Sequence, residues 1–287
     1  MGRINTVSVV ENDKVITLRD GRTLGFAEYG KPGGRPVFYF HGHPGCRFEA
    51  KLLADHAEQM NISIIGVDRP GFGLSTYKPG RKILDWPNDV SELADTLRIE
   101  EFAVAGFSGG GPYALACAYK ISERLSSCAI ISGVGKKSFF VSFLSAWMPW
   151  IMLPLGRKML SDIEKAKETL QKASKRWPEP DRECLNHARV HETMAESLVE
   201  GLSAGSRGAA LDGGLIGRDF GFSLSNINFP KLSLWHGELD GEIPVSVGRD
   251  NARRLQNCNA KFLQGEAHIS VIVNYGKEIL TELIMFE

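Results

Sequence analysis

The chain has 287 residues, enough for one large α/β domain or two smaller domains with a sizeable core. Lysine and arginine together number 34, as do aspartate and glutamate, so the formal net charge is zero. The sequence contains no block of like charge, which argues against a nucleic-acid partner, because such partners normally require a basic surplus or stripe. A small-molecule substrate is the expected partner, and the composition leaves the oligomeric state open.

The first 30 residues predict a pair of strands. Residues 7–18 and 23–29 both have strand composition, and Asp20-Gly21 between them is typical of a hairpin turn. From residue 36 onward, apolar runs alternate with helical segments. Strands are expected at 36–40, 62–67, 101–107 and 125–132, and helices at 47–60, 83–97 and 112–121. This alternation indicates a mostly parallel, doubly wound α/β sheet that is covered on both faces.

The alternation stops at residues 133–135. Residues 136–228 are helical in composition and carry no clear buried strand. Strands then return at 231–235 and 261–263, and helices at 245–255 and 269–285. An insertion of this length between two strands of one sheet predicts a helical cap, or lid, over the carboxyl ends of the strands, where ligands bind in open α/β sheets. We therefore divide the chain into a core (1–135 and 229–287) and a cap (136–228).

The predicted cap begins with an apolar stretch, residues 138–155. Its length approaches that of a membrane span, but Pro149, Pro154 and several serines interrupt it, so we interpret it as pocket lining and expect no stable membrane insertion. Phe143 and Trp147 lie in this stretch. Together with Phe107 they are the expected substrate-binding residues.

The clearest chemical motif is Gly106-Phe107-Ser108-Gly109-Gly110. It follows a predicted strand and precedes a predicted helix with a proline in its first turn, which is the setting in which this pattern presents a nucleophilic serine. The flanking glycines suit a sharp turn, because side chains there would collide. The helix start also directs N–H groups and positive potential toward charge that develops beside Ser108.

A serine hydroxyl needs a base within hydrogen-bond reach before it can act as a nucleophile. His268 is the candidate base and Asp240 the candidate acid that orients it, and both follow predicted strands near the end of the chain. Serine, acid and histidine then occur in the chain order of a nucleophile-elbow hydrolase. Taken singly, His268 could cap the last helix and Asp240 could make a turn with Gly241.

The segment His41-Gly42-His43-Pro44-Gly45 follows the strand at 36–40. A tetrahedral intermediate needs two fixed N–H donors, and the backbone of Gly109 and of His43 can supply one each. We interpret His41 as a structural residue that braces this loop, and the His43 side chain as one that could reach the mouth of the site.

Five motifs occur in a fixed order over nearly the whole chain outside the predicted cap. They are His41-Gly42-His43-Pro44-Gly45, Asp68-Arg69-Pro70-Gly71-Phe72-Gly73-Leu74-Ser75, Gly106-Phe107-Ser108-Gly109-Gly110, His236-Gly237-Glu238-Leu239-Asp240 and Ala267-His268. With these motifs the chain resembles the α/β-hydrolase superfamily, in its branch of capped, carboxylesterase-like serine hydrolases.

The resemblance implies roles for individual residues. Ser108 would be the nucleophile, His268 the general base and then acid, and Asp240 the partner of His268. The loop at 68–75 would be a structural turn, with Arg69 as a candidate substrate-facing residue. Gly109 departs from the family pattern, in which a bulkier residue often follows the nucleophile, and we expect a more open turn in consequence.

The predicted function is hydrolysis of a carboxylic ester, or a related acyl bond, of a small hydrophobic substrate through an acyl-enzyme. A proline-releasing aminopeptidase ranks lower, because Phe107 replaces the tryptophan and His43 the second glycine usual in that family. A perhydrolase and a carbon–carbon bond hydrolase remain open. Outside enzymes, the alternative is a ligand-binding or signalling protein that keeps the triad and turns over slowly.

The remaining features bear on cofactors and compartment. The five cysteines are widely spaced without a Cys-x-x-Cys pair, and the first residues contain no apolar signal stretch, so we expect a reducing, cytoplasmic location. His187 and His191 have a spacing that could bind a metal on a helix face, but no metalloprotease motif accompanies them. No phosphate-binding or dinucleotide motif follows the first strand, and neither a metal nor a cofactor is expected.

Overall fold

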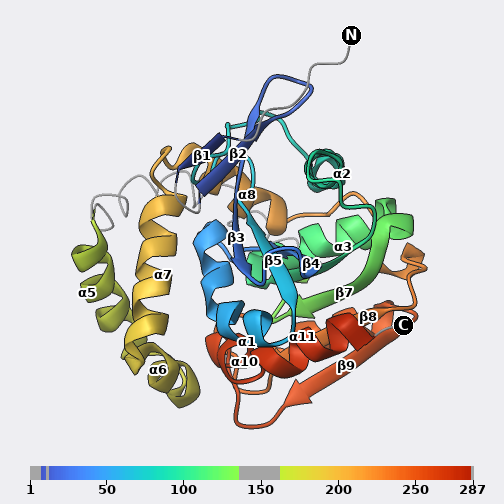
Figure 1. Ribbon diagram of the computed structural model, residues 1–287. Coiled ribbons are helices and arrows are strands. Elements are labelled where there is room, and N and C mark those ends of the chain that lie inside the picture. The colour runs from blue at the N-terminus through green and yellow to red at the C-terminus, as the bar shows by residue number, and fades with distance from the viewer. Residues whose placement is uncertain (1–7, 11–12, 136–161, 286–287) are drawn as a thin grey trace.

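The computed structural model describes residues 8–10, 13–135 and 162–285 (Figure 1). These residues contain one nine-stranded sheet in the order β1-β2-β3-β5-β4-β6-β7-β8-β9. The strands are β1 (Ser8–Val10), β2 (Asp13–Thr17), β3 (Thr23–Gly30), β4 (Arg35–Phe40), β5 (Ile62–Val67), β6 (Phe102–Phe107), β7 (Leu125–Ile131), β8 (Leu232–Gly237) and β9 (Cys258–Leu263). The pairs from β5 to β9 are parallel and those among β1, β2, β3 and β5 are antiparallel, so the prediction of a mostly parallel α/β sheet is confirmed.

The helices fill most of the connections between these strands. They are α1 (Ala54–Gln59), α2 (Trp86–Thr96), α3 (Gly111–Lys120), α5 (Ile163–Ser174), α6 (Glu179–Asn186), α7 (Ala188–Gly201), α8 (Arg207–Ile216), α9 (Val245–Arg254), α10 (Ile269–Asn274) and α11 (Gly276–Met285). Shorter 3₁₀ segments occur at Arg47–Leu53, Ile83–Asp85, Ser108–Gly110, Ser122–Arg124 and Leu224–Asn226. Helices α5 to α8 all lie between β7 and β8 in the chain, within the stretch where the sequence predicts helix and no strand.

Helices cover both faces of the sheet. Side chains of successive strand residues point to opposite faces, so each strand contributes to the packing on both sides. In β4, Phe38 and Phe40 pack into the cluster that contains buried residues of α2 and α3. Val37 and Tyr39 pack into a second cluster, with buried residues of α1, α10 and α11. Apolar residues on both sides of a strand are the pattern of a doubly covered parallel sheet.

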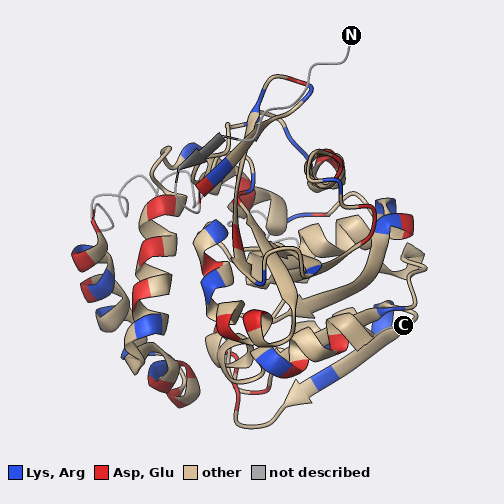
Figure 2. Ribbon diagram, in the orientation of Figure 1, with Lys and Arg blue, Asp and Glu red and all other residues tan. Residues whose placement is uncertain are grey.

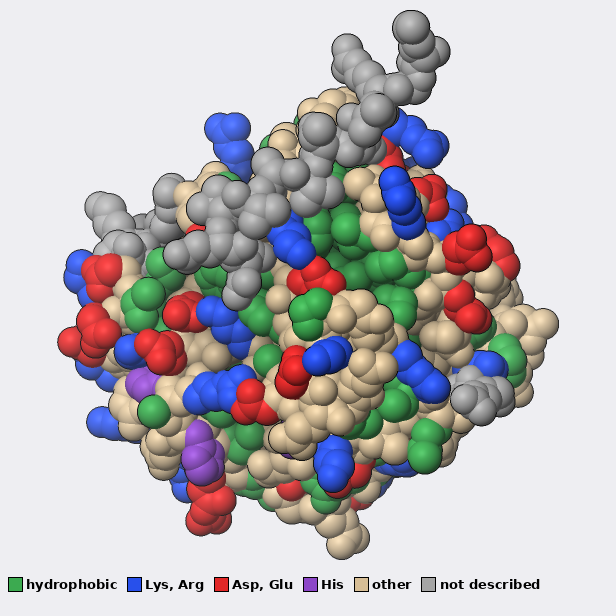
Figure 3. All heavy atoms as spheres, in the orientation of Figure 1, with side chains coloured by type: hydrophobic (Ala, Val, Ile, Leu, Met, Phe, Trp, Pro, Cys, Tyr) green, Lys and Arg blue, Asp and Glu red, His purple; other side chains and the backbone are tan. Residues whose placement is uncertain are grey.

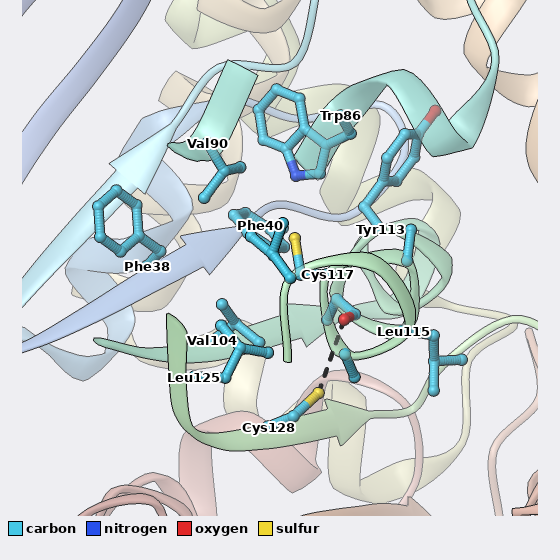
Figure 4. Packing of buried hydrophobic residues seen from close by; sticks show 14 of the residues in the cluster. Phe38, Phe40, Trp86, Val90, Val104, Tyr113, Leu115, Cys117, Leu125 and Cys128 are labelled. Atoms are coloured by element: carbon cyan, nitrogen blue, oxygen red, sulfur yellow. Dashed lines mark hydrogen bonds between the residues drawn. The ribbon is translucent and has the colours of Figure 1, made fainter. Parts of the chain in front are cut away.

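Aromatic rings fill much of the first cluster (Figure 4). The Trp86 ring meets Phe40 edge-on, with ring centroids 5.3 Å apart, and lies 6.0 Å from the Tyr113 ring. Edge-to-face packing of this kind stabilises aromatic pairs beyond the burial of their area. The Tyr113 hydroxyl points out of the apolar cluster, which leaves it free to bond elsewhere (Figure 4).

Helices α5, α6 and α7 stand together beside the sheet, at the left of Figure 1. Their own small cluster of buried residues includes Ala166, Leu170, Leu185 and Ala195. Val190 of α7 also belongs to the cluster that contains α1, α10 and α11, and Ile216 of α8 belongs to the cluster that contains α2 and α3. Two of the helices between β7 and β8 thus pack into the core.

Several predicted elements are divided in the structure. The helices expected at 47–60 and 83–97 each begin with a 3₁₀ segment and continue as α1 and α2. The expected strand at 7–18 is two antiparallel strands, since Val10 pairs with Asp13, and the polar residues Glu11 and Asn12 separate them in the sequence. The expected helix at 269–285 is α10 and α11. At the start of α11 a Cβ on Gly276 would lie 2.6 Å from Leu53 Cδ2, so glycine lets the second helix pack closely against this side chain.

Acidic and basic side chains intermingle on the outer surface. On the face seen in Figures 2 and 3, both signs occur along α5, α7 and α11, in keeping with a balanced net charge. None of the helices in the described ranges combines the length and apolar composition needed to cross a bilayer.

Candidate active site

Ser108 lies at the sharp turn between β6 and α3. The strand ends one residue before it and the helix begins three residues after it. Its φ is +49°, in the left-handed region that non-glycine residues rarely occupy, and only 8% of its surface is exposed. A Cβ on Gly106 would lie 2.5 Å from the Gly110 carbonyl oxygen, so this strained turn needs glycine at that position.

The glycines that follow Ser108 are tightly packed. A Cβ on Gly109 would lie 2.8 Å from His43 Cβ, and one on Gly111 would lie 3.1 Å from the Cα of Gly133. The expectation of a more open turn is therefore wrong, because the missing side chains let neighbouring segments approach. The close approach places the His43 backbone against Gly109, as a shared oxyanion site would require.

His268 and Asp240 form a hydrogen-bonded pair beyond the carboxyl ends of β8 and β9. His268 Nδ1 lies 2.8 Å from Asp240 Oδ2, and its N–H donates because a carboxylate can only accept. Asp240 Oδ1 accepts the backbone N–H groups of Glu242, at 2.9 Å, and Ile243, at 2.7 Å. Asp240 therefore makes both the turn and the histidine contact that the sequence left as alternatives.

The surroundings of His268 favour its protonated form. Burial lowers the pKa of this imidazole. The Asp240 hydrogen bond and the charge of Glu242 raise the pKa by more than burial lowers it, so it lies above the ordinary 6.5. Glu242 Oε2 is 3.6 Å from His268 Nε2, and the Glu242 side chain is half exposed. The ring of Phe107, next to Ser108, packs against His268 with centroids 5.0 Å apart.

His236 is a second histidine beside Asp240, to which the sequence assigned no role. Its Nε2 lies 2.8 Å from the Ile243 carbonyl, to which it donates, and 3.5 Å from Asp240 Oδ2. Burial lowers the pKa of His236 below 6.5, which keeps it neutral. It supports the turn that carries Asp240.

Asp181, in α6, holds the backbone of His268. Its carboxylate accepts the N–H groups of His268 at 3.0 Å and of Ile269 and Ser270 at 2.8 Å each. These are the first free donors at the start of α10, and an acidic cap also suits the positive end of a helix. No sequence pattern indicates this contact, which joins segments nearly 90 residues apart.

The loop after β4 is held by a buried carboxylate that the sequence analysis missed. Glu49 Oε2 accepts the Gly42 N–H at 2.6 Å and the Tyr39 hydroxyl at 3.1 Å. Burial raises the pKa of Glu49 to about 7, against the lowering effect of those two hydrogen bonds.

The next N–H along the loop, that of His43, has no hydrogen-bond partner among the described residues.

Arg69 is fully buried, so the hypothesis that it faces substrate is wrong. Its guanidinium binds Asp212 of α8, with Nη2 to Oδ2 at 2.9 Å. Arg81 binds the other Asp212 oxygen, and the Tyr113 hydroxyl donates to that oxygen at 2.6 Å. His43 Nδ1 lies 3.3 Å from Asp212, so the His43 side chain turns toward this cluster.

The three expected substrate contacts are only partly visible. Phe107 is buried beside His268, whereas Phe143 and Trp147 lie outside the described residues. Of the two histidines with metal-binding spacing, His187 immediately precedes α7 and His191 lies within it, where its Nε2 is bonded 3.0 Å from the Lys167 carbonyl. Within the described part of the chain, no group of three or more histidine, cysteine or acidic side chains is placed to hold a metal.

Comparison with protein families matches residues 35–173 to the family described as alpha/beta hydrolase fold. An uncharacterized hydrolase of Bacillus subtilis (strain 168), YcgS, is 32% identical over 119 residues, which are 41% of this chain and 40% of that protein. The chain thus matches about two fifths of the length of this curated relative.

Solved structures resemble the chain over nearly its full length. A hydrolase from Pseudomonas aeruginosa PA01 has a TM-score of 0.73 at 18% identity, covering 97% of this chain and 99% of that one. A thermophilic esterase from Thermogutta terrifontis has a TM-score of 0.71 at 20% identity, covering 95% and 97%. At these identities the likeness establishes the fold.

Proposed function

The chain belongs to the α/β-hydrolase superfamily, and from that premise we propose that it is a serine hydrolase that cleaves a carboxylic ester of a small hydrophobic substrate. The observation that carries the proposal is the buried His268–Asp240 pair beyond the carboxyl ends of β8 and β9, in the same sheet as the strand that ends at the strained Ser108 turn. Such a histidine–carboxylate pair is what a serine nucleophile needs for activation.

The proposed reaction has two acyl-transfer steps. Ser108 Oγ attacks the ester carbonyl while His268 Nε2 takes its proton, and Asp240 stabilises the imidazolium that forms. The carbonyl oxygen becomes an oxyanion on the N–H groups of His43 and Gly109, and the alcohol leaves with the proton from His268. Water, deprotonated by the same imidazole, attacks the acyl-enzyme, and the acid leaves as Ser108 recovers its proton.

The helices between β7 and β8 suit a role as a cap in this proposal. We assign residues 136–228 to the cap and the rest to the core, with Phe107, Phe143 and Trp147 as contacts for the hydrophobic part of the substrate. The contact of Asp181 with the His268 backbone supports a cap that bears directly on the site. A cap rich in apolar residues favours uncharged acyl or alcohol groups.

We also propose a cytoplasmic location. All five cysteines are free thiols, and four of them are buried: Cys46, Cys117, Cys128 and Cys184. Buried free thiols with no disulfide are usual in a reducing compartment. Fractionation of the source cells, with antibody against the protein, tests this assignment.

The test of the function is turnover of p-nitrophenyl esters from acetate to decanoate, with fluorophosphonate labelling of the active serine. We expect labelling of Ser108, and a loss of kcat of roughly 10³-fold or more in Ser108→Ala, because the nucleophile is removed. Ser127→Ala is the control, since Ser127 is also a buried serine and its hydroxyl donates to the Leu283 carbonyl. Full esterase activity in Ser108→Ala would refute the mechanism, and labelling without multiple turnover would favour a slow ligand-binding protein.

A further inference from the structure

Arg69 contacts the candidate oxyanion loop, residues 41–45, through two backbone carbonyls. Its Nη1 donates to the His41 carbonyl, and its Nη2 lies 3.1 Å from the Gly42 carbonyl. The side chain is fully buried, and Asp212 supplies its carboxylate partner. Two consecutive carbonyls of the loop are therefore bound to one cation.

His41 supplies a second hydrogen-bond donor to the Gly42 carbonyl. The Arg69 backbone N–H donates to His41 Nε2 at 3.2 Å, so Nε2 carries no proton. The proton of the neutral ring is then on Nδ1, which lies 2.8 Å from the Gly42 oxygen and donates to it. Burial and the charge of Arg69 lower the pKa of His41 well below 6.5, in agreement with a neutral ring.

These contacts fix the direction of one N–H group. The Gly42 carbonyl and the His43 N–H belong to the same peptide unit, and in a trans peptide they point in opposite directions. With the carbonyl held by Arg69 and His41, the His43 N–H points away from them. His43 N lies 3.3 Å from the position of a Cβ on Gly109, so the backbones of the two candidate donors adjoin.

The charge of Arg69 acts in the same sense. Its buried guanidinium binds the Gly42 carbonyl, so a positive charge lies at the carbonyl end of the Gly42–His43 peptide. A carbonyl bound to a cation polarises its peptide, which makes the N–H at the other end a stronger donor. An oxyanion that forms at this N–H then meets a peptide dipole that is already held in place.

We propose that Arg69 is a positioning residue for the oxyanion site: it orients and polarises the Gly42–His43 peptide so that the His43 N–H stabilises the tetrahedral intermediate. This rests on the proposed esterase function. In this proposal the buried Arg69 side chain affects the rate of the reaction and makes no contact with substrate.

The experiment compares Arg69→Gln with Arg81→Lys. The second variant perturbs the same buried carboxylate, Asp212, but Arg81 touches no loop carbonyl among its described contacts. Both are assayed for kcat and KM with p-nitrophenyl acetate, and for inhibition by an aryl trifluoromethyl ketone, whose serine adduct carries an oxyanion. Circular dichroism and thermal melting establish that each variant is folded.

We expect Arg69→Gln to lower kcat by about 10- to 100-fold, somewhat less than deletion of a whole oxyanion donor, and to weaken the ketone by a similar factor. KM and the acid limb of the pH profile should stay near the wild-type values, because His268 is untouched. Arg81→Lys should change neither kcat nor inhibition by more than about threefold. If Arg69→Gln does not fold, Arg69→Lys takes its place, with a smaller loss because one carbonyl contact is kept.

Two results would overturn the proposal: unchanged kcat and ketone inhibition in a folded Arg69 variant, or equal losses in the Arg81 variant. The second result would make the cluster a purely structural one. Failure of the esterase function itself is recognised separately, by wild-type protein that neither turns over esters nor is labelled at Ser108.

Discussion

The two carboxylate oxygens of Asp240 accept different hydrogen bonds. One accepts the N–H of the His268 imidazole, and the other accepts the backbone N–H groups of the turn that follows β8. The turn therefore fixes the carboxylate before the histidine binds it, which reduces the freedom lost when the pair forms. His236, neutral beneath the same turn, completes this support.

Glu242 is the residue whose charge should be visible in the pH profile. A general base works only when deprotonated, so activity falls as the pH drops through the pKa of His268. Because that pKa is raised above 6.5, the acid limb of kcat/KM should lie above pH 6.5. Glu242→Gln removes one of the charges that raise it, so the limb should move to lower pH.

The measurement is kcat/KM for p-nitrophenyl acetate between pH 5 and 9. Glu238→Gln is the matched control, because Glu238 lies in the same loop but pairs with Arg249. A limb that stays at the same pH in Glu242→Gln, or moves equally in the control, would contradict the assignment.

The candidate residues differ in how far the sequence could predict them. Ser108, Asp240 and His268 were predictable because each follows a strand in a motif with its own turn chemistry. Glu49 was not, because an acid inside an amphipathic helical segment has the same pattern whether it meets solvent or a buried N–H. For Arg69 the motif was evident, but its partner Asp212 lies 143 positions away, and only the tertiary fold reveals burial.

At the level of elements, the strands from β3 to β8 were predicted to within a residue or two, whereas the strand expected at 7–18 is divided into β1 and β2, and β9 starts earlier than predicted. β9 begins at Cys258, three residues earlier than expected, because this edge strand is only partly buried and lacks a continuous apolar run. For the helices between β7 and β8, the sequence predicted helical structure without the number or bounds of the helices. Their contacts with the site depend on single polar side chains that no periodicity marks.

Asp181 provides the element-scale prediction. Asp181→Ala removes the cap of α10 and frees the His268 N–H, so we expect a loss of about 1–2 kcal/mol in the free energy of unfolding together with a lower kcat. Asp162→Ala is the control, because Asp162 caps α5 through the Lys165 N–H at 2.9 Å and is far from His268 in the chain. Urea denaturation and ester turnover measure the two effects. A kcat equal in both variants would show that Asp181 acts on stability alone.

At the scale of the whole molecule, polar contacts fasten the inserted helices to the core. Ser197 of α7 accepts the Cys46 N–H at 2.9 Å, and Glu200 binds the buried Arg47 at 2.9 Å. Asp212 of α8 binds two arginines of the core. Because these contacts are buried or partly buried, core and inserted helices should unfold together.

Asp212→Asn tests that coupling most directly. The substitution keeps the shape but leaves Arg69 and Arg81 buried without a countercharge, and breaking a buried ion pair in this way typically costs about 3–5 kcal/mol. Asp250→Asn is the control, since its pairs with Arg253 and Arg254 are largely exposed and should contribute no more than about 1 kcal/mol. The free energy of unfolding is measured in urea by circular dichroism and by tryptophan fluorescence. We expect the two probes to show coincident transitions, with a large loss of unfolding free energy in Asp212→Asn. A loss below about 1 kcal/mol would mean that the cluster relaxes or admits water. Separate transitions would mean that the inserted helices unfold on their own.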